Sequence, residues 1–174
     1  MFLQSERLQL RAPELGDLDF MFHVENDTRL WVVSACKVPF SRYLLQQYIE
    51  TNSHDIYVDK QLRLMMEHRE SRELVGIIDV FDYNPADHRA EVGVVVDGAF
   101  RHLGYAREAL MLLCDYVSSV LGMHQLYAYV LCDNAAAANL FEKCGFMHVA
   151  TLSDWVFSDK KYRSVDLYQR IFEK

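Results

Sequence analysis

The chain has few of the features that mark secreted, membrane-bound or repetitive proteins. Its 174 residues include only three prolines and seven glycines, with no low-complexity run and no internal repeat. No apolar stretch approaches the ~18 residues of a membrane-spanning helix. The first segment, MFLQSERLQLRAPE, carries charges by residue 6 and has no apolar run, so we expect no signal peptide. We expect one cytoplasmic domain over residues 1–174.

Cysteine and histidine show no pattern that indicates a metal or redox centre. The four cysteines, none of them in C-x-x-C spacing, are Cys36, Cys114, Cys132 and Cys144. We expect reduced thiols, as in a cytoplasmic protein. The histidines that lack metal-ligand spacing include His54, His68, His88, His124 and His148. We therefore predict no metal site.

Positive charge is also in short supply. Lysine and arginine number 18 against 25 aspartates and glutamates, which gives a net charge of -7. A nucleic-acid-binding protein needs a basic face, so this balance argues against a nucleic-acid partner. It suits a cationic partner, although many acidic proteins have none. With 51% hydrophobic and 25% charged residues, the composition is that of a globular domain with a core.

The hydrophobic pattern predicts a mixed α+β domain. Strands are expected over residues 4–11, 61–69, 73–83, 88–97, 124–132, 146–157 and 162–172. Helices are expected from Pro13 onward, over 41–52 with Ser41 as N-cap, over 105–121 and over about 134–144. The resulting order is β-α-α-β-β-β-α-β-α-β-β, with an antiparallel meander of three strands in the middle.

One short stretch concentrates the basic residues. Residues 90–110, AEVGVVVDGAFRHLGYAREAL, begin as a strand and end as a helix, with a basic turn over residues 101–107 between them. A helix N-terminus exposes unpaired N–H groups, and Gly104 lets a ligand approach the backbone closely. The side chains that add donors there are Arg101, His102 and Arg107. We predict an anion site for a diphosphate, with a loop of solvated arginines as the alternative.

The basic turn fits neither of the two common phosphate-binding motifs. It lacks both the G-x-x-x-x-G-K-[ST] loop and the G-x-G-x-x-G fingerprint of a βαβ unit. A meander strand precedes it instead, and the helical segment NAAAANLFEKCGF, residues 134–146, follows one strand later.

Together the two motifs resemble those of the GNAT superfamily of N-acetyltransferases. Residues 101–106 resemble its Q/R-x-x-G-x-G/A pyrophosphate loop, and residues 134–146 resemble its N-x-x-A-x-x-x-Y-x-x-x-G-F signature. The segments RAEVGVVVD and DKKYRSVDLYQR resemble the spermidine acetyltransferases and the related ribosomal-protein N-terminal acetyltransferases. The element order matches over essentially the whole chain, which implies a mostly antiparallel central sheet flanked by helices.

The resemblance implies that acetyl-CoA lies in a cleft between strands 88–97 and 124–132. Its pantetheine arm would pair with the main chain near Val95, and its diphosphate would lie on amides of the basic turn. The implied cofactor-binding residues are Val94, Val95, Val96, Arg101, His102, Leu103, Gly104, Tyr105, Ala106, Arg107, Asn134, Ala138, Phe141 and Lys143. Asn134 also has a simpler role open to it, as the cap of the helix that it begins.

The implied reaction is direct attack of a neutral amine on a thioester. An amine with a pKa of roughly 10 must first lose a proton, and backbone N–H groups must polarise the carbonyl. Glu91 is the candidate catalytic residue, because a carboxylate in the apolar strand 90–96 is costly unless it is paired or faces a cleft. The alternatives are an exposed glutamate, or one paired with His88 or Arg89.

The sequence departs from the family at the expected proton donor. Phe141 occupies the position where the family commonly has a tyrosine that protonates the leaving thiolate. Other candidates by residue type are Tyr105, Tyr127 and Tyr129. A thiolate needs little acid help near neutral pH, so we still expect an active enzyme.

A second departure concerns the acceptor. The segment WVVSACKVPF, residues 31–40, is apolar where the spermidine enzymes carry acidic residues, which weakens a polycation site. Trp31 and Phe40 line an acceptor pocket or simply pack, and Tyr162 borders the acceptor or braces the last hairpin. Together with Glu91, Trp31 and Tyr162 are our candidate acceptor-binding residues.

We therefore expect an acetyl-CoA-dependent N-acetyltransferase that acts on a primary amine, first of all a polyamine or diamine. N-terminal acetylation of a protein such as a ribosomal protein is the alternative, and a non-catalytic acetyl-CoA sensor is another. We expect no nucleic-acid or membrane partner. A homo-oligomer is also open, since members of this family often pair subunits.

Overall fold

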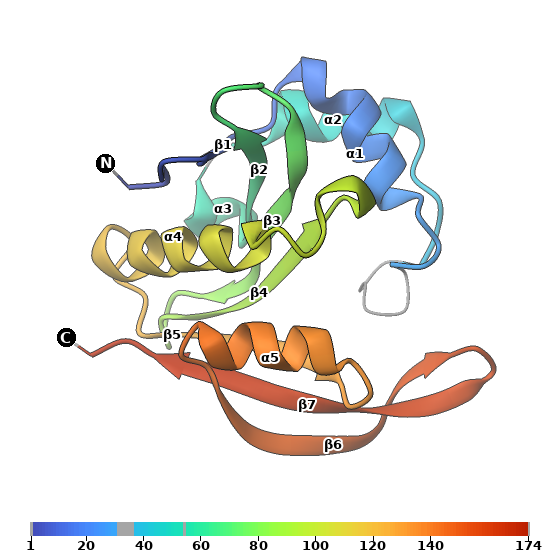
Figure 1. The fold of residues 1–174 in the computed structure, drawn as a ribbon, viewed down its shortest axis with the longest axis vertical. Coiled ribbons are helices and arrows are strands. Elements are labelled where there is room, and N and C mark those ends of the chain that lie inside the picture. The colour runs from blue at the N-terminus through green and yellow to red at the C-terminus, as the bar shows by residue number, and fades with distance from the viewer. Residues whose placement is uncertain (1, 31–36, 54, 174) are drawn as a thin grey trace.

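The computed structural model describes residues 2–30, 37–53 and 55–173, and a central sheet organises them (Figure 1). The strand order is β1-β2-β3-β4-β5-β7-β6. The strands are β1 (Leu8–Arg11), β2 (Leu62–His68), β3 (Leu74–Asn84), β4 (Arg89–Val96), β5 (Gln125–Leu131), β6 (Met147–Ser158) and β7 (Lys161–Ile171). Neighbouring strands pair antiparallel except β4 and β5, which run parallel.

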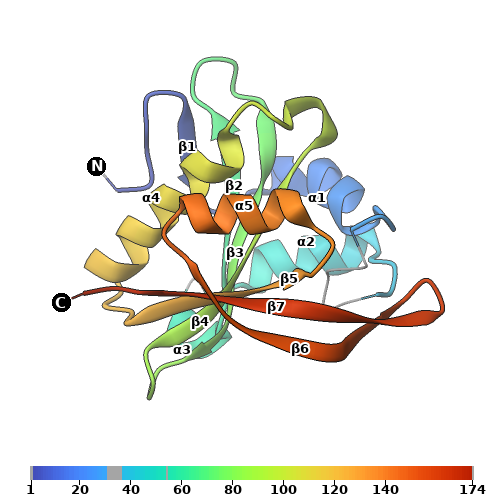
Figure 2. The ribbon, with the colours of Figure 1, turned by 60° about the horizontal axis from the view of Figure 1, so that its bottom comes forward.

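Helices cover both faces of the sheet. They are α1 (Leu18–Glu25), α2 (Arg42–Thr51), α3 (Ile56–Asp59), α4 (Tyr105–Ser119) and α5 (Ala135–Lys143), with short 3-10 turns η1 (Leu15–Asp17) and η2 (Gly98–Phe100). Figure 2 shows α4 and α5 on the near side of the sheet, with α1 and α2 behind it. Among the described residues, no helix combines the length and apolar composition that a membrane crossing requires.

The alternation of side chains along the strands builds two cores. Met66 and Ile78 lie in the larger core beneath α4 and α5. Met65 and Ile77 lie in the smaller core beneath α1 and α2. Because successive side chains of a strand point to opposite faces, the central strands β2, β3 and β4 contribute to both cores. Glu91, four residues before Val95 of the smaller core, therefore faces α1 and α2.

The order of strands and long helices predicted from the sequence is confirmed. Three details differ. The first strand is shorter than residues 4–11, because Ser5 turns the chain back: its hydroxyl accepts from the Leu8 N–H at 2.9 Å. The first helix begins at Leu18 rather than Pro13, because η1 precedes it. The four-residue α3 was not predicted, since one turn is too short for a periodic signal.

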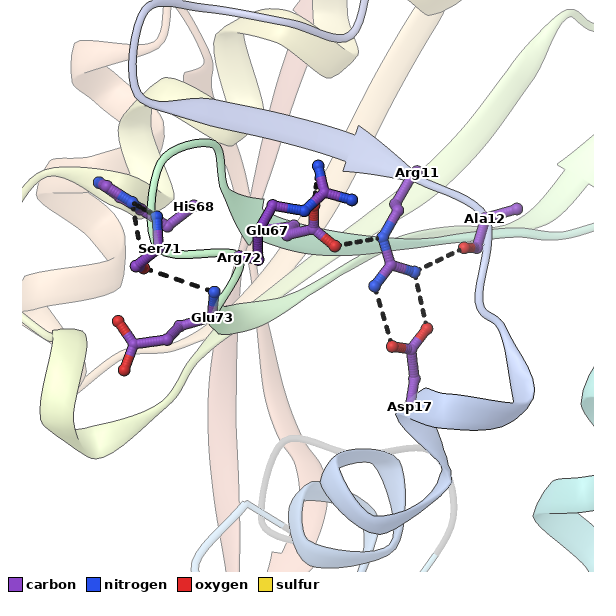
Figure 3. A network of polar contacts seen from close by, with 8 residues as sticks. All are labelled: Arg11, Ala12, Asp17, Glu67, His68, Ser71, Arg72 and Glu73. Atoms are coloured by element: carbon purple, nitrogen blue, oxygen red, sulfur yellow. Dashed lines mark hydrogen bonds and ion pairs between the residues drawn. The ribbon is translucent and has the colours of Figure 1, made fainter.

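A buried ionic network fixes the entry to α1 onto the sheet (Figure 3). The Arg11 guanidinium donates to both carboxylate oxygens of Asp17, at 2.8 and 2.9 Å. Its Nε donates to Glu67 at 2.6 Å, and Arg72 completes the pairing of Glu67 at 2.8 Å. Asp17 and Glu67 are only 4% and 3% exposed, so the network joins β1, β2 and η1 inside the protein.

Candidate active site

Strands β4 and β5 pair briefly and then separate (Figure 1). Their register joins residues 89–91 to residues 125–127 and ends there. Beyond that point β4 stays paired with β3 as far as Val96, and β5 stays paired with β7 as far as Leu131. The edge of β4 over residues 92–96 therefore borders an opening in the sheet.

A cavity of about 630 Å³ occupies this opening. Its lining includes Glu91, Val94, Val95, Tyr129, Asn134 and Phe141 from β4, β5 and the α5 side. At the other end the lining comes from α1, α2 and the strands beneath them, including Glu25, Phe40, Leu44, Tyr48, Arg63 and Asp79. The cavity thus passes from the α5 face of the sheet to the α1 and α2 face, past Glu91.

Glu91 lies at the point where the two strands diverge. Its side chain is half-buried, and the carboxylate has no ion-pair or hydrogen-bond partner among the described residues. Arg89, the partner that the sequence left open, pairs with Asp87 instead. Burial, reinforced by the nearby charge of Asp82, raises the pKa of Glu91 to about 7. A carboxyl with this pKa is suited to accept a proton near neutral pH.

Asp82 reaches the same point from a distorted part of β3. Its φ of 52° lies in the left-handed region, at an irregularity of register between Phe81 and Asn84. The Tyr127 hydroxyl donates to Asp82 Oδ2 at 3.0 Å. Burial and this hydrogen bond raise the pKa of Tyr127, so the phenol keeps its proton.

The three tyrosines suggested as proton donors therefore separate in space. Tyr129 lines the cavity, with its ring 5.8 Å from that of Tyr127. Tyr127 donates to Asp82. Tyr105 is buried in the larger core and does not line the cavity. Phe141 is buried and lines the cavity beside Tyr168, onto which its ring stacks at 6.3 Å.

Charged residues that the sequence analysis did not identify line the α1 and α2 end of the cavity. Arg63 donates to both carboxylate oxygens of Asp79, each at 2.8 Å, and also pairs with Glu25. Two carboxylates on one guanidinium leave an excess of negative charge. The available signal was the position of Arg63 and Asp79 in predicted strands, in phase with the apolar Met65 and Ile77.

The basic turn presents backbone amides at the start of α4. Gly104 is the N-cap residue, and its φ of 86° is one that glycine adopts without strain. Gly104 has no side chain with which to cap this helix, so the first-turn N–H groups are open to an anion. Residues 101–104 are all exposed. The turn thus has the open helix end that the predicted diphosphate site requires.

The predicted cofactor residues of β4 and the basic turn differ in whether they line the cavity, pack in the core or are exposed. Val94 and Val95 line the cavity. The Val96 carbonyl accepts from Arg101 Nε at 3.2 Å. The Tyr105 side chain packs in the core, so only its main chain is available at the helix start. The exposed side chains of the turn are those of Arg101, His102, Leu103 and Arg107, and Ala106 is half-buried.

Asn134 both caps α5 and lines the cavity. Its side-chain oxygen accepts from the Ala137 N–H at 3.1 Å, which confirms the capping role and leaves its amide NH₂ group for a ligand. Ala138 packs against the larger core. Lys143 is exposed in the last turn of α5.

The predicted acceptor residues do not all meet at the cavity. Phe40 lines it. Tyr162 does not line it: its side chain is 65% exposed and its ring lies 5.1 Å from that of Phe157, which favours the bracing role in the hairpin. Trp31 lies outside the described residues. The described cysteines, Cys114, Cys132 and Cys144, are free thiols.

Comparison with known proteins defines the family. Residues 7–147 match the model of the acetyltransferase (GNAT) domain. The chain belongs to this family. It is an N-acetyltransferase, and its acetyl donor is acetyl-CoA.

Two curated relatives and one solved structure are similar over most of their length. The chain is 26% identical to the spermidine N(1)-acetyltransferase of Vibrio cholerae, covering 92% of this chain and 91% of that one. It is 25% identical to the enzyme of the same name from Escherichia coli K12, covering 92% and 83%. The structure of the Vibrio cholerae spermidine N-acetyltransferase with CoA and spermine aligns with a TM-score of 0.86, 25% identity and 96% coverage of both chains.

Proposed function

We propose that this chain transfers the acetyl group of acetyl-CoA to a primary amine of a polyamine or diamine, with Glu91 as the proton acceptor. The observation that carries this proposal is the half-buried Glu91 carboxylate, unpaired among the described residues, in a cavity that reaches both faces of the sheet. The similarity to enzymes named spermidine acetyltransferases supports the choice of acceptor.

In the proposed reaction the Glu91 carboxylate takes a proton from the substrate ammonium. The freed nitrogen lone pair forms a bond to the thioester carbonyl carbon, the carbon–sulfur bond breaks, and the CoA thiolate leaves. As the amide forms, the nitrogen loses its second proton to water. Phe141 cannot protonate the sulfur, and a thiol pKa of roughly 8.5 makes the thiolate a leaving group that needs little acid help.

The walls of the cavity support a cationic, flexible acceptor. The pairing of Arg63 with both Asp79 and Glu25 leaves the α1 and α2 end with more negative than positive charge. The lining also alternates charged and apolar side chains along β3, where Asp79 is followed on the same face by Phe81, the strand partner of Glu91. Ammonium groups separated by methylene chains match this alternation of charged and apolar surface.

The free thiols agree with a protein of the cytoplasm, where cysteines stay reduced, and we place the activity there.

The proposal is tested by incubating the protein with acetyl-CoA and a panel of amines, with product detection by mass spectrometry. The panel contains spermidine, spermine, putrescine-type diamines, amino acids and short peptides with free N-termini. Acetylated polyamine or diamine is the expected product. Turnover of peptides alone would move the function to protein N-termini, and CoA binding without any product would contradict the proposed transfer.

A further inference from the structure

We propose that Arg7 is a positioning residue for the diphosphate of acetyl-CoA, acting through the basic turn. Arg7 directly precedes β1 and lies far in sequence from the turn that it contacts. Its Nη1 donates to the Leu103 carbonyl at 3.3 Å. Its Nε donates to Glu108 at 3.0 Å, and its guanidinium lies 4.7 Å from the ring centre of Tyr105. One side chain thus contacts the turn, the first residue of α4 and the first helical turn.

The bond to Leu103 fixes the orientation of a peptide group in the turn. In a trans peptide the C=O and the following N–H point in opposite directions. Because Arg7 holds the Leu103 oxygen on its own side, the Gly104 N–H is held on the side away from Arg7. An amide with a fixed direction binds an anion better than one that must be ordered on binding.

Within the described part of the chain, few other contacts hold the turn in this shape. His102 and Gly104 both have left-handed φ values, 64° and 86°. The N-cap residue Gly104 has no side chain to cap α4, and the Arg101 side chain donates to the Val96 carbonyl rather than across the turn. The contact from Arg7 therefore supports the turn from a separate segment of the chain, the residue that directly precedes β1.

Arg7 also neutralises an acidic group at the anion site. Glu108 stands in the first turn of α4, where its charge would repel a diphosphate bound to the same helix end. The Glu108 carboxylate is instead paired with Arg7 and accepts from the Ser5 hydroxyl. Removing Arg7 would free a carboxylate beside the ligand as well as a main-chain carbonyl.

This inference requires that acetyl-CoA is the donor and does not depend on the acceptor. The test is the binding of CoA by calorimetry to the wild type, Arg7→Met, Arg7→Lys, Glu108→Gln and the double variant Arg7→Met/Glu108→Gln. We expect Arg7→Met to raise the Kd for CoA about tenfold, as for loss of one charge-assisted hydrogen bond. Arg7→Lys should lose less, Glu108→Gln alone should bind CoA at least as well as the wild type, and the double variant should recover part of the affinity.

If Arg7 only stabilised the fold, its loss would impair the reaction with every acetyl donor equally. A positioning role for the diphosphate instead affects only donors that carry it. With an accepted amine, Arg7→Met should raise KM for acetyl-CoA while kcat at saturation stays within about twofold. Its kcat/KM with acetyl-pantetheine, a donor without the diphosphate, should not change. Arg89→Met is the matched control, since Arg89 is similarly exposed (42% against 45% for Arg7) and pairs with Asp87 away from the turn. Unchanged CoA affinity in Arg7→Met, or equal losses with both donors, would overturn the proposal.

Discussion

Glu91 and Tyr127 form the last residue pair that joins β4 to β5 before the two strands separate. The carboxylate therefore lies where the two strands begin to diverge. The cavity reaches it from the α5 face of the sheet and from the face covered by α1 and α2. Tyr127 is tied to Asp82, so a second carboxylate is held close to the first. This placement gives Glu91 both its exposure to the cavity and its raised pKa.

The first prediction concerns the dependence of turnover on pH. The pKa of Glu91 is about 7 and the ionised form accepts the proton, so kcat/KM should rise with pH up to about 7 and then level off. In Asp82→Asn the neighbouring negative charge is gone while an oxygen acceptor for Tyr127 remains. The rising limb should move to lower pH, although not fully, because burial is the larger cause of the shift. A pH profile that is flat between 5 and 8 would contradict this role.

Stability should change with pH in the opposite sense. The pKa of Glu91 is higher in the folded protein than in the unfolded chain, so the folded state holds the proton more tightly. The free energy of unfolding therefore falls as pH rises from the pKa of the unfolded chain toward about 7, the pKa in the folded protein. Glu91→Gln should therefore stabilise the protein at pH 8, by about 1 kcal/mol after allowance for solvent screening, and have little effect at pH 4. Urea unfolding of both proteins at the two pH values measures this difference.

Gly104→Ala tests the conformation of the basic turn. The φ of 86° strains any residue with a Cβ, while the nearest atom to an added Cβ, Arg7 Nη2, is 3.7 Å away, so strain rather than collision is the cost. We expect a loss of stability of about 1 kcal/mol and a clear rise in the Kd for CoA, measured by calorimetry. Gly98→Ala, at a position with open space and no positive φ, is the control and should bind CoA normally.

The network around Arg11 should contribute strongly to stability. Arg11→Met leaves the Asp17 carboxylate buried without its ion pair and removes one partner of Glu67. Breaking a buried pair on one side costs about 3–5 kcal/mol, which lowers Tm by roughly 6–20 °C in a chain of this size. Arg42→Met removes a largely exposed pair with Asp19 and should cost at most about 1 kcal/mol. Equal effects of the two changes would show that burial does not matter here.

The sequence predicted the parts of the fold that depend on local pattern. The apolar stripe of α4, the caps Ser41 and Asn134, and the basic turn before α4 are all visible in short segments, and the structure places them as expected. Glu91 could be found because a charge interrupts an apolar strand.

Features that depend on distant segments could not be predicted. The pairing of Arg63 with Asp79 and Glu25, and that of Arg7 with Glu108, require the register of the folded sheet. The local sequence also does not reveal that β4 and β5 diverge after Glu91, or that Asp82 within β3 has a left-handed backbone conformation. These contacts supply the charge and shape of the cavity.

The most direct test of the account compares Glu91→Gln with the wild type in kcat/KM for spermidine and in Kd for CoA. If Glu91 accepts the proton, kcat/KM should fall by about 10²–10⁴-fold while the Kd for CoA stays nearly unchanged, since glutamine keeps the size of the side chain. Turnover equal to that of the wild type would contradict the central claim and remove Glu91 from the mechanism.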